Sequence, residues 1–121
     1  MEVTRTRALR GPNLWSRHTA IEAVVHCPPG EADLSQTPDF ERRLRRLFPH
    51  IGALHANKPS EPITLAHALE NAALALQAEA GCPVTFSRTT ATPEAGTYQV
   101  VVQYSEEPVG RLAFELAQQL V

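Results

Sequence analysis

The chain has 121 residues, of which 43% are hydrophobic and 20% are charged, and its formal net charge is −2. This balance predicts one globular domain over residues 1–121 with one modest core, and it excludes a disordered chain and a strongly basic nucleic-acid binder. No apolar run approaches the roughly 18 residues of a membrane span, and the N-terminus lacks the apolar core of a signal peptide, so we expect a cytoplasmic protein without membrane contact.

The first half of the chain predicts two strands and one helix. Residues 3–9 and 19–26 have strand-like patterns, and a tight turn at Gly11-Pro12-Asn13 follows the first of them. Thr37 as an N-cap and Pro38 as the first helical residue then mark the start of a helix. This helix carries an apolar stripe at helical spacing, made of Phe40, Leu44, Leu47, Phe48 and Ile51. Residues 50–62, rich in proline and polar side chains, predict a connection.

The second half predicts a helix, two strands and a final helix. The helix covers residues 63–80 and ends at Gly81, a common helix terminator. Residues 82–90 and 97–104 predict strands joined by a turn at 92–96, and the second strand places Tyr98, Val100, Val102 and Tyr104 on one face. Ser105 caps the last helix, whose expected buried stripe is Val109, Leu112, Ala113, Leu116, Ala117 and Leu120. The order ββααββα predicts an α+β domain in which about three helices pack on one face of a largely antiparallel sheet of about four strands.

The helix at 63–80 contains HALEN (residues 67–71), one residue short of the H-x-x-E-H motif by which a helix holds a catalytic zinc. His67, Glu70 and Asn71 lie side by side on this helix, and apolar residues on both of its sides predict burial almost all round. A catalytic zinc needs three protein ligands and one open position, and the neutral amide of Asn71 is a poor ligand. The residues leave two readings open, a hydrogen-bonded polar cluster or a zinc site completed by a histidine from elsewhere, namely His18, His26, His50 or His55.

Three segments of the chain, in this order, carry a resemblance to a known family. They are ALRGPNLWSR (8–17), TLAHALENAALALQAEAGCPVTFSRTT (64–90) and GTYQVVVQYSEEPVGRLAFELAQQLV (96–121). Together they resemble the N-terminal domain of cyanophycin synthetases. The resemblance implies cytoplasmic, ATP-dependent ligases that build a polymer with an aspartate backbone and an arginine on each side-chain carboxylate. Their chemistry belongs to ATP-grasp and Mur-ligase-like domains, which use ATP and magnesium and are absent from this chain, so no cofactor is expected in this domain.

The resemblance also implies a role for the N-terminal domain, which holds the growing polymer near those active sites. In some members it carries a zinc-dependent hydrolytic site that cuts polymer into primers, built on H-x-x-E-H with a further glutamate four residues on. Mapped here, this motif falls on His67, Glu70, Asn71 and Ala75, so the second histidine and the downstream carboxylate are replaced. We therefore predict no metal site and no catalytic residue, with His67 and Glu70 as degenerate remnants of the motif.

The expected function is a non-catalytic domain that binds the polymer and docks against the two catalytic domains. Trp15 offers an indole face to polymer guanidinium groups, unless it anchors the core, and Arg10 and Arg17 flank it. Arg88 shares strand parity with Phe86, which predicts partial burial and a partner, and Glu70 and Glu22 are candidate acidic contacts. Two alternatives stay open: a zinc-dependent hydrolytic domain that clips the polymer, or a purely structural domain that positions its neighbours.

Overall fold

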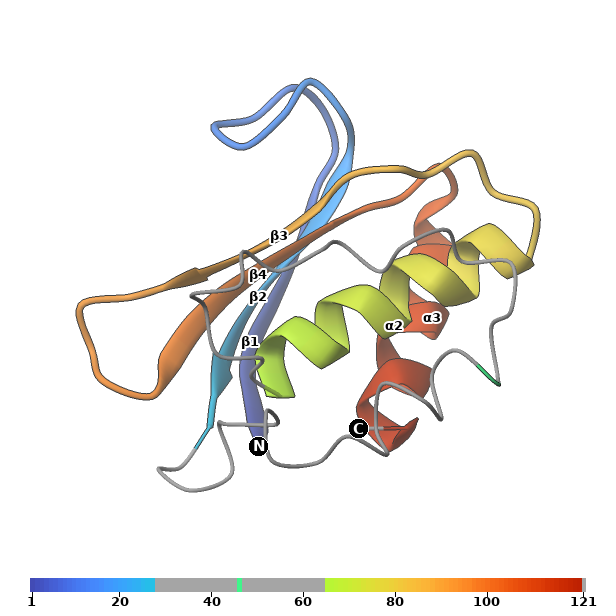
Figure 1. Cartoon of the computed structure of the whole chain (residues 1–121). Helices are drawn as coiled ribbons and strands as arrows, with labels where there is room; N and C mark the ends of the chain where they lie inside the picture. Colours follow the sequence, from blue (N-terminus) through green and yellow to red (C-terminus); the bar gives the residue numbers. More distant parts are fainter. Residues whose placement is uncertain (28–45, 47–64, 121) are drawn as a thin grey trace.

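The computed structural model describes residues 1–27, 46 and 65–120, and these contain four strands and two helices (Figure 1). The elements are β1 (Glu2–Leu9), β2 (Ala20–His26), α2 (Leu65–Glu79), β3 (Ser87–Ala91), β4 (Thr97–Gln103) and α3 (Glu107–Leu120). The predicted order ββααββα with about three helices is therefore wrong, because the described residues give ββαββα with two helices.

The extra helix of that prediction falls on residues 38–51, and both it and the connection at 50–62 lie outside the described residues, Arg46 apart. Its support came from local signals only: Thr37 as an N-cap, Pro38 as the first helical residue and the spacing of apolar residues. Most helical stability in proteins comes from packing an amphipathic face against the rest of the fold, so spacing alone does not establish a helix.

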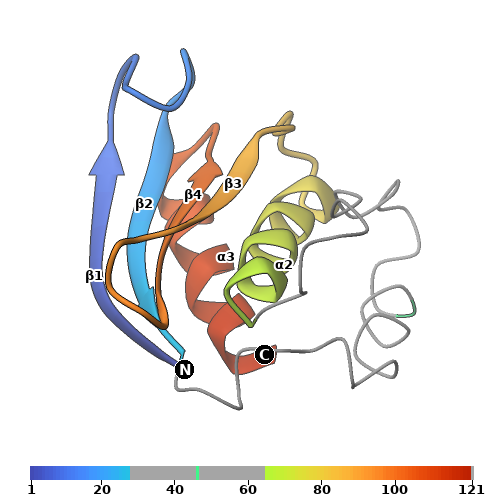
Figure 2. The same cartoon turned by 60° about the vertical axis from the view of Figure 1, so that its left-hand side comes forward.

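The sheet is antiparallel throughout, with strand order β1-β2-β4-β3, and both helices lie on one of its faces (Figure 2). This inner face carries the core, where Ile21 and Val25 of β2 join Val100 and Val102 of β4 in one apolar cluster. Tyr104 belongs to the same cluster and Tyr98 packs against it, so the predicted shared face of the fourth strand is confirmed. The opposite, outer face of the sheet has neither α2 nor α3 on it.

Helix α2 is buried on almost every side, as its sequence predicts. It packs against β3, β4 and α3, and its buried residues are mostly alanines, which allow close approach on several sides. The helix ends at Gly81, whose φ of +88° lies in the left-handed region that glycine adopts without strain. Gly81 and Cys82 donate their backbone N–H groups to the carbonyls of Ala78 and Gln77, so the last turn is satisfied.

Helix α3 buries only part of the predicted stripe, namely Ala113 and Ala117. Its buried residues are Gly110, Ala113, Phe114 and Ala117, whereas Leu112, Leu116 and Leu120 remain 55%, 40% and 36% exposed. The prediction was wrong for these three leucines, because the side of the helix that carries the small residues Gly110, Ala113 and Ala117 is the side that packs against the rest of the domain. A Cβ atom at Gly110 would lie 2.6 Å from the Cβ of Tyr104, so only glycine permits this approach of the helix to the end of β4.

Strand β3 is shorter than predicted and begins at Ser87 instead of residue 82. The backbone N–H groups of Thr85 and Phe86 donate to the side-chain oxygen Oε1 of Gln103, at 2.9 and 3.0 Å. The side chain of Gln103 thus takes the place of a further strand partner, and ladder pairing starts only where Ser87 faces Val102. No helix in the described part of the chain is long and apolar enough to cross a membrane.

Candidate functional site

A row of side chains crosses the outer face of the sheet from edge to edge. The register pairs Arg7 of β1 with Glu22 of β2, Glu22 with Val101 of β4, and Val101 with Arg88 of β3. Neighbouring residues in a strand point to opposite faces, and Ile21 and Ala23 belong to the core, so Glu22 and its row lie on the outer face. An arginine therefore stands at each end of the row.

Glu22 is the centre of this row and is only 8% exposed. The Nη2 group of Arg7 donates to both carboxylate oxygens at 3.1 Å, and the indole N–H of Trp15 donates to Oε2 at 3.2 Å. A cation and a polar N–H group offset the cost of burying this carboxylate. Glu22 thus orients both the guanidinium of Arg7 and the indole of Trp15.

The turn between β1 and β2 holds Trp15 in place through Asn13. The side-chain oxygen of Asn13 accepts hydrogen bonds from the backbone N–H groups of Trp15 and Ser16, at 2.9 and 3.0 Å. Its side-chain nitrogen donates to the carbonyl of His18 at 2.9 Å, which ties the two ends of the turn together. This is the backbone-mimicking behaviour for which asparagine is favoured in turns, and it fixes a half-buried tryptophan beside the outer face.

Arg88 lies in the outer row and is exposed. The expectation that it would be partly buried is wrong. Ser87 and Thr89, the residues on either side of it, face inward toward α2, so Arg88 projects from the opposite face. The structure therefore brings Trp15 and Arg88 to the same face of the sheet.

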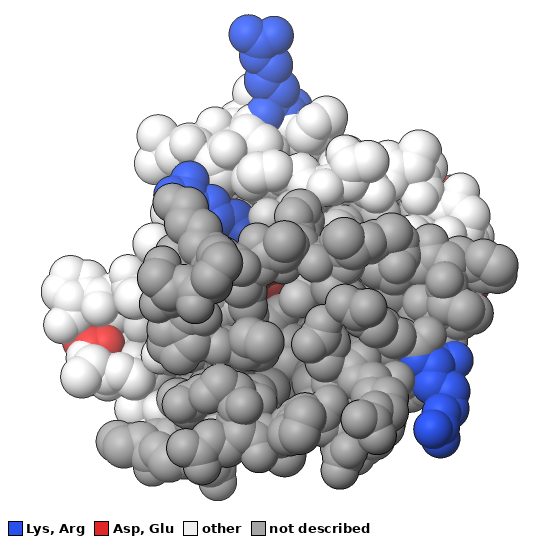
Figure 3. All heavy atoms as spheres, viewed as in Figure 1, with Lys and Arg blue, Asp and Glu red and all other residues white. Residues whose placement is uncertain are grey.

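Arg10 and Arg17 are both exposed, on the connection between β1 and β2. The Nε group of Arg10 pairs with Oε1 of Glu107 at 2.8 Å, which ties this connection to the first turn of α3. The hydrogen bond to Arg10 lowers the pKa of Glu107, and the same bond raises the pKa of Arg10. Where Lys and Arg of the described residues are visible in Figure 3, they project at separate points and form no continuous basic patch on that view.

Glu70 lies on the other side of the sheet and is 4% exposed. The hydroxyl of Ser87 donates to its Oε1 at 2.7 Å and the hydroxyl of Thr89 donates to its Oε2 at 2.5 Å. These bonds join α2 to β3, so the structure separates Glu70 from Trp15 and Arg88. Contact with Glu70 would require a ligand to reach the layer between helix and sheet.

The other positions of the zinc-like motif lie along α2, with His67 and Asn71 half-buried and Ala75 buried. Among the described residues, no three His, Cys, Asp or Glu side chains come together as a metal site. Of the four histidines that were candidates for completing one, His18 is exposed, and Nδ1 of His26 lies 3.3 Å from Oγ1 of Thr97. His50 and His55 lie outside the described residues.

Sequence reasoning missed Arg7, which is the partner of Glu22. The signal was the alternation within β1, which places Arg5 and Arg7 on one face of an edge strand. It also missed Ser87 and Thr89, whose hydroxyls bind Glu70 from residues 17 and 19 positions away in the sequence.

The fold is a two-layer α+β domain, and its candidate site is the outer row of the sheet beside a tryptophan-bearing turn, with exposed arginines at its ends and the buried Glu22 and Val101 between them. The family model described as the cyanophycin synthase-like N-terminal domain matches residues 30–121, and the chain belongs to this family. A cyanophycin synthetase of Geminocystis herdmanii is 33% identical over 133 residues, and one of Trichormus variabilis is 32% identical over 132. Both alignments cover 99% of this chain but 15% of the relative, so the chain spans about 15% of the length of these relatives.

Proposed function

We propose that this chain is the polymer-binding and docking domain of a cytoplasmic cyanophycin synthetase. The family match supports this role, and so do the relatives, which are named cyanophycin synthetase. The chain corresponds to about 15% of the length of such a relative. The observation that carries the proposal is the outer face of the sheet, which has neither α2 nor α3 on it and presents charged side chains beside Trp15. On this proposal, ATP and magnesium act in the ATP-grasp and Mur-ligase-like domains, and this domain has no catalytic residue of its own.

The row on the outer face suits a polymer that alternates guanidinium and carboxylate groups. Arg88 has an exposed guanidinium that can bind a polymer carboxylate through two parallel hydrogen bonds. The indole of Trp15 can stack with a polymer guanidinium for about 0.5–2 kcal/mol. Three inter-strand spacings separate Arg7 from Arg88, roughly 14 Å, so an extended polymer segment laid across the strands spans both.

Glu22 supports this surface without being its main contact. It is nearly buried, and its carboxylate already receives hydrogen bonds from Arg7 and Trp15. We therefore assign it a positioning role: it keeps the indole and one guanidinium in a fixed arrangement, so less conformational entropy is lost when polymer binds.

Titration of labelled, soluble polymer chains of defined length against the 121-residue protein tests the proposal. We expect saturable binding at low salt that weakens as ionic strength rises. Arg88→Ala and Trp15→Leu should each raise the Kd roughly 3- to 10-fold, equivalent to about 0.7–1.4 kcal/mol. Arg88→Lys is the matched control, because it keeps the charge but loses the bidentate fork, and it should fall between wild type and alanine.

Two results would count against the proposal. The first is the absence of saturable binding at low salt for the wild-type protein, which would favour a domain that only positions its neighbours. The second is binding that neither Arg88→Ala nor Trp15→Leu weakens, which would move the polymer site away from the outer face.

A further inference from the structure

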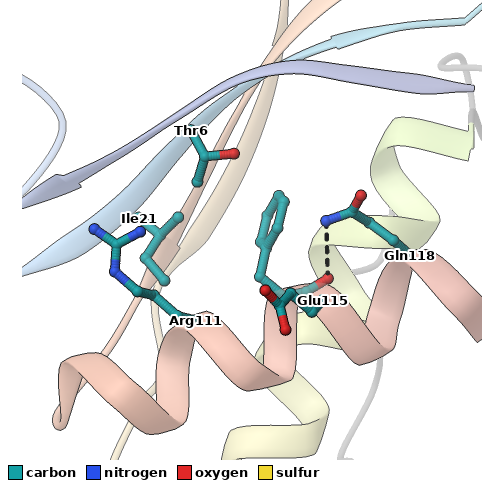
Figure 4. Close-up of a pocket in the computed structure, with 6 residues that line it drawn as sticks. Thr6, Ile21, Arg111, Glu115 and Gln118 are labelled. Carbon is teal, nitrogen blue, oxygen red and sulfur yellow. Dashed lines mark hydrogen bonds between the residues drawn. The ribbon is translucent and has the colours of Figure 1, made fainter.

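A groove lies on the inner side of the sheet, between the edge strand β1 and helix α3 (Figure 4). Its volume is about 180 Å³, and its lining comes from two strands and one face of the helix: Thr6, Ile21, Arg111, Phe114, Glu115 and Gln118. Helix α2 packs on the same face but against β3 and β4, toward the edge of the sheet opposite β1. The inner side of β1 is therefore covered less closely than the rest, and Thr6 stays exposed there.

The floor of the groove is apolar and its rim is charged. Phe114 is 2% exposed and belongs to the core, while Arg111 and Glu115 are exposed and stand one helical turn apart on α3. In Figure 4, Arg111 and Gln118 lie toward opposite ends of the groove and Glu115 lies between them. The groove thus offers a cation and an anion above an apolar floor.

The guanidinium of Arg111 has only a weak partner within the described part of the chain. Its Nη2 lies 4.0 Å from Oε1 of Glu107, whereas that same oxygen is 2.8 Å from Arg10. Glu107 is therefore engaged mainly by Arg10, and the side chain of Arg111 remains 45% exposed. A carboxylate entering the groove would offer Arg111 a closer partner than the one it has.

We propose that this groove binds one aspartate–arginine unit, with its carboxylate on Arg111 and its guanidinium on Glu115. The inference rests on the proposed function and adds a second polymer contact, on the side of the sheet opposite Trp15 and Arg88. The aliphatic part of the arginine lies over the apolar floor of the groove, and the amide of Gln118 and the hydroxyl of Thr6 border the polar ends. Sites for whole small-molecule ligands typically exceed about 300 Å³, so this smaller groove fits a single side chain of the polymer.

The same chemistry sets a preference for arginine over lysine. A planar guanidinium can donate two parallel hydrogen bonds to the carboxylate of Glu115, whereas an ammonium group acts as a point charge. A unit with lysine in place of arginine should bind more weakly for this reason. When the carboxylate that binds Arg111 is converted to an amide, the unit loses its negative charge at that point and should bind Arg111 more weakly.

The test uses the aspartate–arginine dipeptide as a probe of the 121-residue protein, observed by NMR and calorimetry. We expect the dipeptide to shift the backbone amide signals of Thr6, Arg111, Glu115 and Gln118. Glu115→Gln and Arg111→Gln should each raise the dipeptide Kd at least about 5-fold. Glu94→Gln, which removes an exposed carboxylate in the β3–β4 turn, is the matched control and should change nothing. For the wild-type protein, the lysine analogue and the carboxyl-amide should each bind more weakly.

The outcomes separate this inference from the proposed function. If polymer binds but Glu115→Gln and Arg111→Gln leave both polymer and dipeptide affinity unchanged, the groove is not a binding site and the outer face keeps its role. If the dipeptide shifts the groove signals while polymer does not bind, the groove is a site for the free unit and the proposed function is wrong. If neither ligand binds, both are overturned. Because these substitutions are at exposed positions, unchanged thermal unfolding will show that the variants are folded.

Discussion

A nearly buried glutamate lies on each side of the sheet, Glu70 from α2 on the inner side and Glu22 from β2 on the outer side, and the two carboxylates have different partners. On the inner face, Glu70 accepts hydrogen bonds from two neutral hydroxyls, those of Ser87 and Thr89. On the outer face, Glu22 accepts hydrogen bonds from the charged Arg7 and from the indole of Trp15. Glu70 joins a helix to a strand within the fold, whereas Glu22 organises side chains that face solvent.

The difference shows that burial alone does not tell whether a carboxylate serves packing or a binding surface. The two side chains are exposed to similar extents, 4% for Glu70 and 8% for Glu22. Their partners separate them, because Arg7 extends from Glu22 into solvent with half of its side chain exposed, while Ser87 and Thr89 point back into the domain. Substitutions on the two sides of the sheet test this contrast, and the closely packed inner side should respond most strongly.

The largest effect is expected at Gly110, where α3 meets the end of β4. In Gly110→Ala the new Cβ would lie 2.6 Å from the Cβ of Tyr104 and 3.3 Å from Cδ1 of Ile21, so backbone must shift. We expect the free energy of unfolding to fall by about 3 kcal/mol, as for an overpacked core. Chemical denaturation measures this. Gly11→Ala is the control, because a Cβ at that position would have no atom within 4 Å, and it should be nearly neutral.

A smaller loss is expected for Glu70→Ala. The change removes two hydrogen bonds to a charged group, each worth about 1.5–3 kcal/mol, but it also removes the cost of burying that charge, so the net loss should be about 2 kcal/mol. Glu70→Gln keeps one acceptor and should cost less than alanine. Denaturation of both variants measures the difference, and an alanine variant as stable as wild type would show that Glu70 does not join α2 to β3.

A still smaller change in stability, about 1 kcal/mol, is expected for Glu22→Gln, since Arg7 is half exposed and can be solvated when its partner loses its charge. Removing the side chain altogether, as in Glu22→Ala, should also change the fluorescence of Trp15, which hydrogen-bonds to Glu22. Trp15 is the only tryptophan, so its fluorescence reports on the outer face alone. Glu22→Ala should shift the emission and lower the anisotropy of Trp15 in the folded protein. Glu70→Ala should leave both unchanged, and a shift in that variant would mean that the two faces are coupled.

The bounds of some strands and helices could be predicted from the sequence because their signals are local. Turn residues such as Gly11-Pro12-Asn13 and Gly81 mark boundaries through their own backbone preferences, and β2, β4 and the end of α2 were placed within one residue. The start of β3 was missed by five residues, because the side chain of Gln103, far along the chain, takes the hydrogen bonds that a strand partner would have taken.

Only part of the buried side of α3, Ala113 and Ala117, could be predicted, for a related reason. Its leucines recur at helical spacing, which predicts a buried stripe, but the surface that they would face is set by how Gly110 meets Tyr104. The contacts within the candidate site could not be predicted either, because they depend on how strands pair. Trp15 and Glu22 were recognised as candidates, but the hydrogen bond between them, and the one from Arg7, depend on the register of β1 against β2.

The smallest predicted effect concerns the ion pair between Arg10 and Glu107, which links the β1–β2 connection to α3. The hydrogen bond from Arg10 lowers the pKa of Glu107 below its ordinary value of 4.5, so the folded state binds fewer protons than the unfolded state in this range. The contribution of the pair to stability is thus fully present above pH 4.5 and is lost as the pH falls through the lowered pKa of Glu107. The raised pKa of Arg10 has no effect there, since it stays protonated throughout.

A double-mutant cycle with Arg10→Gln and Glu107→Gln isolates this coupling. We expect a small coupling at pH 7 that is lost at an acidic pH below the lowered pKa of Glu107 and shrinks in high salt, because both groups are solvent-accessible. The measurement is the difference in thermal unfolding midpoints across the cycle at each pH. A coupling of equal size at both pH values would show that the two side chains interact through packing and not through charge, and the connection next to Trp15 would then be held to α3 by contacts that protonation does not break.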